Sequence, residues 1–437
     1  MAAVPKSSIK AADIVARVSE GSFSNLLLDA LRYSGELSDD EMRQVTATVC
    51  GTVEKKIAID HILSGYLKKG STEKLDRDVR AILETGAYRI LYMDSMPDHA
   101  VVNMCVDMCS RYRKTSAKGL VNAILRKIAQ SRNEIKTSIE SNPSPAMRYS
   151  VDESICEAIS ADYGERTDDI LASFSGIKPV HIRINTLKTD EGSFLEELDS
   201  KEIQYERTDI PGCIRLKGGS LRLMSSFEKG SFRVQSYAAQ CAVDALCPEP
   251  GIDMLDSCSA PGGKTVSSAI RMKNTGTITA VDKYPGRTKL VENACREAGI
   301  DIVRTVVANM TKGLDRDTMY DRILCDVPCS GLGEISGKPE IRLHRTEEYK
   351  ELPAIQYEIL EKSAAHLKAG GILVYSTCTI LKRENEEIIE RFLSRHEEFT
   401  EREVKEYEGS EKAARGRIFL PSNLNSEGFY IASLLRL

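Results

Sequence analysis

The chain of 437 residues contains no tryptophan, few other aromatic residues and no long apolar run. Aromatic residues make up 6% of the sequence, which argues against a carbohydrate-binding surface or one rich in stacked rings. No stretch approaches the ~18 uncharged apolar residues of a membrane span, and the first ten residues lack the apolar core of a secretory signal. We therefore expect a cytoplasmic protein that makes no membrane contact.

The chain also lacks an excess of positive charge. Its 60 basic and 65 acidic residues give a net charge of −5, which excludes a uniformly basic nucleic-acid-binding protein but not a local basic face. The 12 cysteines show no Cys-x-x-Cys spacing, so the sequence predicts no metal site. In the cytoplasm we expect these cysteines to be reduced and mostly buried, as Cys105 and Cys109 on one apolar helix face would be.

The length and the apolar pattern predict three domains. Residues 1–135 carry apolar side chains at helical spacing, as at Ile59, Ile62 and Leu63, and predict an all-α bundle. The segment Asn-Pro-Ser-Pro at 142–145 is typical of a linker. Over 181–186 polar and apolar side chains alternate, which predicts a strand. Residues 145–235 are therefore expected to form a small α+β module, in which 213–219 and 220–225 are two further strands around a Gly-Gly turn.

Residues 236–437 alternate between predicted strands and predicted helices. The strands end near Asp256, Asp282, Asn309, Asp326 and Cys378, and the helices lie near 286–298, 346–368 and 384–396. This order predicts an α/β, Rossmann-like fold with a doubly wound parallel sheet. Ligands of such sheets bind outside the carboxyl ends of the strands, where the unusual residues of this chain gather.

The segment DSCSAPGGKT (256–265) combines a strand end with a glycine-rich turn that begins a helix. Such a turn directs backbone N–H groups at a ligand. A phosphate-binding loop would need glycine at Cys258, so nucleotide hydrolysis is disfavoured. A tight turn alone explains the glycines but not the combination with Cys258, Pro261 and Lys264. Asp282, about 20 residues further on at the next strand end, is typical of a residue that binds ribose hydroxyls.

Two cysteines lie just after predicted strand ends, in DVPCSG (326–331) and YSTCT (375–379). One such cysteine could be a packing residue, but two favour a nucleophile, because a thiolate forms at modest cost from a free pKa of about 8.5. A thiolate that adds to C6 of cytosine makes C5 able to accept a methyl group. This chemistry calls for an acid near N3 and the exocyclic amine, for which Asp326 is placed, and a second thiol fits the later elimination. The residues alone do not choose between Cys329 and Cys378 as the nucleophile.

A basic run without an acidic residue spans residues 110–133. Apolar residues such as Val121, Ile124 and Leu125 give this predicted helix an inner face, so the basic side chains point outward. Solvation is the usual reason for exposed charge, but a face of one sign on an acidic protein fits attraction to phosphates. We expect RNA binding through Arg113, Lys114, Lys118, Arg126 and Lys127.

These residues carry a resemblance to the RNA cytosine-5 methyltransferase family. The C-terminal half is similar through VQSYAAQ (234–240), DSCSAPGGKT (256–265), AVDKYPGR (280–287), DVPCSGLG (326–333), YSTC (375–378) and EGFYIASL (427–434). The N-terminal part resembles the NusB-like RNA-binding fold through MPDHAVVN (96–103) and KGLVNAILRK (118–127). This pairing resembles the 16S ribosomal RNA cytosine-5 methyltransferases of the RsmB (Sun/Fmu) type.

The resemblance implies S-adenosyl-L-methionine as the cofactor. It implies cofactor contacts from Cys258, Ser259, Ala260, Pro261, Gly262, Gly263, Lys264, Asp282, Arg287, Asn309 and Asp326. Asp282 would bind the ribose, and Asn309, which stands where the family usually has an acidic residue, would bind the adenine amine. The same resemblance assigns the nucleophile to Cys378 and help in product release to Cys329, with Asp326 lining both the cofactor and the cytosine.

The resemblance further implies that the substrate is 16S ribosomal RNA, unassembled or partly assembled. The same chemistry on transfer RNA or 23S ribosomal RNA is one alternative, and a non-catalytic NusB-like RNA-binding factor is another. Methylation of an exocyclic amine is disfavoured, because it needs an Asp/Asn-Pro-Pro-aromatic motif and no thiol, whereas the chain has Asp-Val-Pro-Cys at 326–329.

Overall fold

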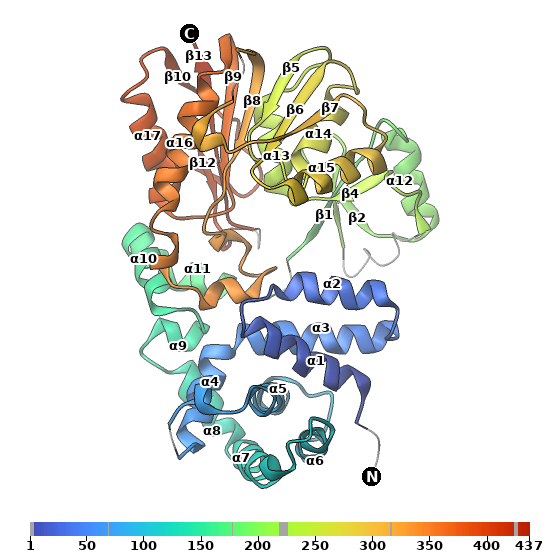
Figure 1. The fold of residues 1–437 in the computed structure, drawn as a ribbon, viewed down its shortest axis with the longest axis vertical. Coiled ribbons are helices and arrows are strands. Elements are labelled where there is room, and N and C mark those ends of the chain that lie inside the picture. The colour runs from blue at the N-terminus through green and yellow to red at the C-terminus, as the bar shows by residue number, and fades with distance from the viewer. Residues whose placement is uncertain (1–3, 69, 177, 218–225, 315–316, 424–426) are drawn as a thin grey trace. The chain divides into compact units, whose positions relative to one another are not determined.

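The computed structural model describes residues 4–68, 70–176, 178–217, 226–314, 317–423 and 427–437 (Figure 1). The chain divides into two compact units, one formed by Met1–Ser175 and Ile335–Thr346, the other by Gly176–Glu334 and Glu347–Leu437. Within the described residues, no helix has the length and apolar content needed to cross a membrane.

The first unit is built from helices, as the apolar spacing predicted for residues 1–135, and it also contains the helices at 145–173 and 339–343. They are α1 (Lys6–Val18), α2 (Ser24–Ser34), α3 (Asp39–Glu54), α4 (Lys56–Tyr66), η1 (Thr72–Lys74), α5 (Arg77–Tyr92), α6 (Asp98–Arg111), η2 (Thr115–Ala117), α7 (Lys118–Gln130), α8 (Arg132–Glu140), α9 (Pro145–Tyr149), α10 (Glu153–Tyr163), η3 (Gly164–Arg166), α11 (Thr167–Ser173) and η7 (Pro339–Leu343). The start of α3 is fixed by a capping box, in which Ser38 and Glu41 satisfy each other's backbone N–H groups. Cys105 and Cys109 lie in the core of this unit, which confirms the packing role predicted for them.

The segment Ile335–Thr346 belongs to this helical unit although it is distant in sequence. The guanidinium of Arg342 is buried and donates hydrogen bonds to the carbonyls of Glu54 (3.3 Å), Tyr149 (3.2 Å) and Phe174 (3.1 Å). The carboxylate of Glu340 accepts hydrogen bonds from the backbone N–H and the hydroxyl of Ser24 at the start of α2, where the helix dipole favours negative charge. Polar contacts on both sides therefore anchor the segment in the helical unit.

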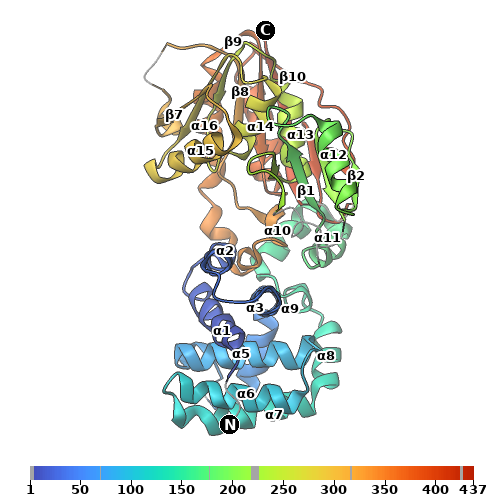
Figure 2. The same ribbon diagram turned by 90° about the vertical axis from the view of Figure 1, so that its right-hand side faces the viewer.

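The second unit begins with a small module of strands and one helix. These are β1 (Val180–Ile184), α12 (Glu191–Ser200), β2 (Tyr205–Arg207), β3 (Cys213–Leu216) and β4 (Phe232–Val234). The strands form an antiparallel sheet in the order β2-β3-β1-β4, and Figures 1 and 2 show α12 against it. Ile182 and Phe194 belong to the apolar cluster between sheet and helix. The predicted α+β character is confirmed, while the strand predicted at 220–225 lies outside the described residues.

The larger sheet of the second unit contains the predicted Rossmann-like arrangement. Its elements are α13 (Tyr237–Leu246), β5 (Asp253–Asp256), α14 (Gly263–Arg271), β6 (Thr277–Asp282), α15 (Pro285–Ala298), β7 (Val303–Val307), η5 (Met310–Lys312), β8 (Tyr320–Asp326), η6 (Leu332–Glu334), η8 (Thr346–Tyr349), α16 (Leu352–Ala364), β9 (Leu367–Thr377), η9 (Lys382–Glu384), α17 (Glu386–Leu393), β10 (Phe399–Arg402), β11 (Ser410–Lys412), β12 (Arg417–Phe419) and β13 (Phe429–Arg436). Strands β5 to β9 pair in parallel, which confirms the α/β prediction. The sheet is mixed rather than all parallel, because β13 pairs antiparallel with β9, and β10, β11 and β12 extend that side.

The strand order β11-β12-β13-β9-β8-β5-β6-β7 has a switch point at β5. From β5 the chain moves outward through β6 and β7, then returns to pair β8 on the other side of β5. The carboxyl ends of β5, β8 and β9 therefore meet at one edge of the sheet. A crevice at such a switch point is the usual ligand site of open α/β sheets.

Candidate active site

The two cysteines singled out by the sequence lie side by side at this edge. Strands β8 and β9 pair with Asp326 opposite Ser376, so the residues that follow both strands emerge together. The sulfur atoms of Cys329 and Cys378 are 3.0 Å apart. The backbone N–H of Cys378 also donates a hydrogen bond to the sulfur of Cys329 at 3.3 Å. Strand register thus brings together two thiols that are 49 residues apart in the chain.

The surroundings of Cys378 favour its protonated thiol. The hydrogen bond with Cys329, together with the loss of hydration and nearby negative charge, raises the pKa of Cys378 well above its usual value. The sulfur of Cys329 also accepts the backbone N–H of Cys378. The raised pKa means that Cys378 holds its proton in this structure, with Cys329 within hydrogen-bond reach.

Lys264 and Asp326 form an ion pair beside the thiols. The ammonium nitrogen of Lys264 lies 2.7 Å from Oδ2 of Asp326, whose Oδ1 accepts a hydrogen bond from the hydroxyl of Ser376 at 2.8 Å. Burial alone would lower the pKa of Lys264, but the attraction and hydrogen bond of Asp326 outweigh it, and the pKa is raised. The proton of this pair therefore lies on Lys264. Asp326 is suited to accept a hydrogen bond, for example from an exocyclic amine.

The glycine-rich turn between β5 and α14 is held tightly against β6. Gly262 has a φ of +101°, and a Cβ there would lie 3.1 Å from the Cα of Val291, so both conformation and space require glycine. The backbone N–H and the hydroxyl of Ser259 both donate to the carbonyl of Val281. Loss of hydration raises the pKa of Cys258 well above its usual value, which keeps it a thiol. The turn that contains residues 258–264 is therefore a fixed feature of the sheet edge.

Arg287 connects this turn to the end of β6. Its guanidinium donates to the carbonyl of Ala260 at 3.2 Å and pairs with Oδ2 of Asp282 at 3.3 Å. Ala308 donates its backbone N–H to the carbonyl of Asp282, so Asn309 follows beside the same strand end. The side-chain oxygen of Asn309 accepts hydrogen bonds from the backbone and hydroxyl of Thr311. The structure thus gathers the predicted cofactor residues along the ends of β5, β6 and β7.

Two buried polar atoms at the turn have no hydrogen-bond partner among the described residues. They are Oδ1 of Asp256, an acceptor, and Nε2 of Gln235, a donor. Oδ2 of Asp256 accepts from Thr265, and a Cβ at Gly263 would lie 3.7 Å from the Gln235 amide nitrogen. An acceptor and a donor of this kind fit the ammonium and carboxylate of an amino acid, the group at one end of S-adenosyl-L-methionine.

Sequence reasoning missed Gln235 and Ser376 as site residues. Both lie inside motifs that carried the family resemblance, at 234–240 and 375–378, but their partners, Ser267 and Asp326, come from other elements. The motifs themselves were therefore the available signal. Which residue within each motif faces the site depends on the fold.

The predicted RNA-binding residues lie in the helical unit, around α7. Arg113, Arg126 and Lys127 are exposed, as expected for a phosphate-binding face. Lys114 is instead paired with Asp76 at 2.6 Å. Arg132, from the same basic run, is paired with Asp94. The run is thus partly neutralised by aspartates from other parts of the unit.

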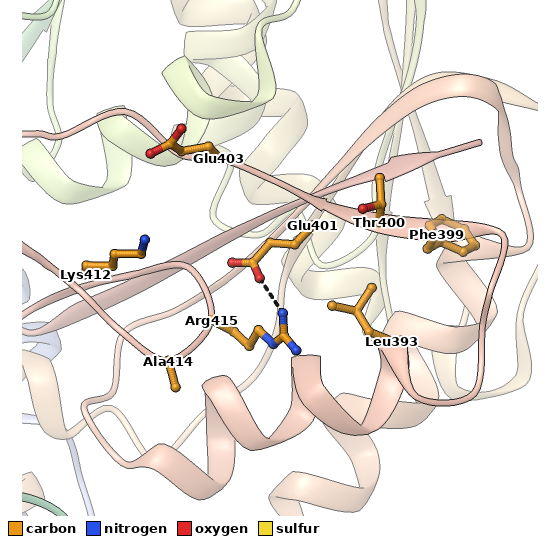
Figure 3. Close-up of a pocket in the computed structure, with 8 residues that line it drawn as sticks. All are labelled: Leu393, Phe399, Thr400, Glu401, Glu403, Lys412, Ala414 and Arg415. Atoms are coloured by element: carbon orange, nitrogen blue, oxygen red, sulfur yellow. Dashed lines mark hydrogen bonds and ion pairs between the residues drawn. The ribbon is translucent and has the colours of Figure 1, made fainter.

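A separate hollow of about 670 Å³ lies beside the antiparallel strands (Figure 3). It is lined by Leu393, Phe399, Thr400, Glu401, Glu403, Lys412, Ala414 and Arg415. Arg415, the central cation in Figure 3, is paired with Glu401 and also with Glu390. None of the predicted site residues lines this hollow. Within the described residues, no group of three His, Cys, Asp or Glu side chains could hold a metal ion.

Comparison with known families matches three parts of the chain. Residues 243–435 match the model of the 16S rRNA methyltransferase RsmB/F, and residues 6–130 match the NusB family. Residues 153–220 match the ferredoxin-like domain of RsmF/B-like methyltransferases. The NusB match lies within the helical unit. The ferredoxin-like match joins the helices α10 and α11 of that unit to the small module, and the methyltransferase match covers the larger sheet together with Ile335–Thr346.

Curated relatives match nearly the whole chain. The probable ribosomal RNA small subunit methyltransferase B of Bacillus subtilis is 30% identical over 94% of this chain and 94% of its own length. The ribosomal RNA small subunit methyltransferase B of Yersinia enterocolitica is 30% identical over 98% of both chains.

Solved structures show the same fold. The crystal structure of PH0851 covers 99% of both chains with a TM-score of 0.84 and 27% identity. A methyltransferase homolog protein from Pyrococcus horikoshii covers 67% of this chain and 98% of its own with a TM-score of 0.60 and 26% identity. The predicted resemblance is confirmed: this chain belongs to the RsmB/F family of 16S rRNA methyltransferases, in the small subunit methyltransferase B group.

Proposed function

We propose that this protein transfers a methyl group from S-adenosyl-L-methionine to C5 of a cytosine in 16S ribosomal RNA, through a covalent bond between Cys378 and C6. The observation that carries the proposal is the 3.0 Å contact between the sulfurs of Cys329 and Cys378. The ion pair of Lys264 and Asp326 adjoins it, since Ser376, which donates to Asp326, is two residues from Cys378. Membership of the RsmB/F family supports 16S ribosomal RNA as the substrate.

The residues around the glycine-rich turn fit the cofactor. Asp256 and Gln235 would hold the amino-acid end, Asp282 would accept hydrogen bonds from the ribose hydroxyls, and Asn309 would meet the adenine. Arg287 would support the turn through its hydrogen bond to the carbonyl of Ala260. The other residues in contact with the cofactor would be those of the turn: Cys258, Ser259, Ala260, Pro261, Gly262, Gly263 and Lys264. S-adenosyl-L-methionine, when bound there, supplies the methyl group.

Cys378 performs the addition. Its thiol, which is partly exposed, gives its proton to water, and its sulfur forms a bond to C6, so the electron pair of the C5=C6 bond becomes available at C5. The sequence suggested Asp326 as the acid near ring N3, but the raised pKa of Lys264 favours Lys264 as the proton donor there. Asp326 then accepts a hydrogen bond from the exocyclic amine. The charge that develops on the ring is thereby met by groups already in position.

Release of the methylated base needs a base and a leaving group. The proton on C5 is removed, the proton on N3 returns to Lys264, the C5=C6 bond forms again, and Cys378 departs as a thiolate. We assign the proton removal to Cys329, whose sulfur lies 3.0 Å from that of Cys378. Cys329 is partly exposed, so the proton that it takes from C5 can exchange with water afterwards.

The target cytosine must leave its stack to reach a thiol at a strand end, so single-stranded or loop RNA is the expected form of the substrate. The exposed cations Arg113, Arg126 and Lys127, with Lys118, would attract the RNA backbone without reading its sequence. We propose that the protein works in the cytoplasm on unassembled or partly assembled 16S ribosomal RNA.

A labelled-methyl assay tests the proposed function. The full chain is incubated with labelled S-adenosyl-L-methionine and with separate transcripts of 16S ribosomal RNA, 23S ribosomal RNA and transfer RNA. Label should enter 16S RNA, and bisulfite mapping should place it at a cytosine. Label only on 23S ribosomal RNA or transfer RNA would mean that this RNA, not 16S ribosomal RNA, is the substrate. RNA binding without any label would support a non-catalytic NusB-like factor.

A further inference from the structure

Three buried polar residues contact the loops at 328–330 and 377–379, which carry the two cysteines. They are Gln356 on α16, Glu384 at the end of η9, and Asn385, which precedes α17. Their side chains are 0–1% exposed. A charged residue this deeply buried needs a reason, because removing a carboxylate from water is costly unless its contacts compensate.

Glu384 and Gln356 hold the backbone on both sides of Cys329. Oε2 of Glu384 accepts the backbone N–H of Ser330 at 2.9 Å. Nε2 of Gln356 donates to the carbonyl of Pro328 at 2.9 Å and to the same Glu384 oxygen at 2.8 Å. The residue before Cys329 and the residue after it are therefore tied to one buried pair of side chains.

Asn385 holds the side chain of the residue before Cys378 and the backbone of the residue after it. Its Oδ1 accepts the hydroxyl of Thr377 at 2.6 Å, and its Nδ2 donates to the carbonyl of Thr379 at 3.0 Å. A direct contact joins the two loops as well, because the hydroxyls of Ser330 and Thr379 lie 2.7 Å apart. Two consecutive residues thus fix the loops that carry the two thiols.

This arrangement is not optimal for stability. Oε1 of Glu384 and Oε1 of Gln356 are buried without a hydrogen-bond partner among the described residues. Unsatisfied buried acceptors destabilise a fold, so an apolar pair of similar size would suit a purely structural purpose better. The contacts that are made all converge on the backbone around the thiols.

We propose that Glu384, supported by Gln356, is a positioning residue for Cys329, and that Asn385 is a positioning residue for Cys378. Residues 384 and 385 together set the separation of the two sulfurs. The inference rests on the proposed function for its kinetic consequences, but the separation of the thiols is measurable without any reaction on RNA.

The proposal predicts opposite effects for two neighbouring residues. Glu384→Met removes the acceptor for Ser330, displaces Cys329 and slows release, so the Cys378–RNA complex should accumulate above the wild-type level. Asn385→Leu displaces Cys378 and slows addition, so the complex should fall to background. Turnover should drop in both by about tenfold or more, the effect of a small misplacement of a reacting group, while affinity for S-adenosyl-L-methionine stays the same. Glu384→Gln retains an acceptor and should restore most of the turnover.

Tyr407→Phe serves as the matched control. Tyr407 is buried in the same unit, and its hydroxyl donates to Asp244 and to the carbonyl of Cys241, so this variant also loses buried hydrogen bonds. It is expected to lower the melting temperature without changing the ratio of trapped complex to turnover. If Glu384→Met and Asn385→Leu behave as this control does, the two residues are structural and the proposal is overturned.

Oxidation by diamide tests the thiol separation independently of methyl transfer. Diamide takes one hydrogen from each thiol to become a hydrazine, and a disulfide between Cys329 and Cys378 forms. Mass spectrometry of the linked peptides should show rapid formation in the wild type, Glu384→Gln and Tyr407→Phe, and formation slowed by about tenfold in Glu384→Met and Asn385→Leu. Equal rates in all five proteins would overturn the inference. Slowed rates without any protein–RNA complex in Cys329→Ala would uphold the inference and contradict the proposed covalent mechanism.

Discussion

The ammonium of Lys264 lies 2.7 Å from the carboxylate of Asp326, although 62 residues separate them in the chain. Lys264 lies in the first turn of α14 and Asp326 ends β8, so their contact depends on β5 and β8 being neighbours in the sheet. The pair joins the glycine-rich turn to the first cysteine motif. It therefore links the cofactor side of the site to the proposed cytosine side.

Lys264→Met should abolish methyl transfer and destabilise the fold. Asp326 would lose its cation partner, and because its side chain is 28% exposed we expect a loss of about 1–3 kcal/mol, less than for a fully buried pair. The double variant Lys264→Met, Asp326→Asn should regain part of that stability and none of the activity. Urea unfolding and the labelled-methyl assay measure the two effects, and an active Lys264→Met variant would remove Lys264 from the mechanism.

Asp256 should make the stability of the protein depend on pH. Burial raises the pKa of its carboxyl to about 7, with the neighbouring Asp326 adding to the shift. Below pH ~4 the group is protonated in both the folded and the unfolded chain, so the folded state begins to lose stability only above that pH, and the loss is complete near pH 7. At ~1.4 kcal/mol per pKa unit, the loss amounts to a few kcal/mol.

Asp256→Asn removes this titration. The stability of the variant relative to the wild type should therefore rise from pH 5 to pH 7 and stay level from pH 7 to pH 8. Unfolding by urea at each pH gives the difference. A difference that does not change over this range would mean that Asp256 ionises normally in the folded protein.

The exposed cations of the helical unit should control the salt dependence of RNA binding. Replacing both Arg126 and Lys127 with glutamine should reduce the slope of log affinity against log salt by about 0.7–0.9 for each phosphate that the variant no longer binds. Lys114→Gln is the matched control, since Lys114 is already paired with Asp76 and its replacement should change the slope less. Filter binding over a range of salt concentrations measures both, and equal effects of the two changes would mean that α7 presents no special phosphate-binding face.

The strand-end motifs could be predicted from the sequence because local features define them. Each motif joins an apolar run to the residues that come soon after it in the chain: the glycines at 262 and 263, the cysteine after Asp326, or the cysteine after Thr377. The general rule that ligands bind at the carboxyl ends of parallel strands then brings the motifs to one edge. The roles of the site residues, and the domain limits at 135, 145 and 235, stay predictions.

Other features depend on partners that are distant in the chain. Lys114 and Arg132 form ion pairs with Asp76 and Asp94, which lie outside the basic run in the chain. The sequence of the run alone therefore overestimates the number of unpaired cations in the fold. Residues 383–387, at the start of the helix predicted near 384–396, are almost all charged, which is typical of an exposed segment. Glu384 and Asn385 are nevertheless buried, next to the loops that carry the two thiols. The short strands β10 and β11 carry too many charged residues to show the alternation that identifies a strand.

The central claim is that Cys378 bonds to the RNA while Cys329 resolves that bond, and a trapping experiment with three variants tests it most directly. Each protein is incubated with 16S RNA and S-adenosyl-L-methionine and analysed by denaturing electrophoresis. Cys329→Ala should accumulate a protein–RNA complex methylated at C5, whereas Cys378→Ala and the double variant should form none, although all three should still bind the cofactor. A complex that accumulates with Cys378→Ala and not with Cys329→Ala would reverse the two roles, and the absence of a complex from every variant would contradict covalent catalysis.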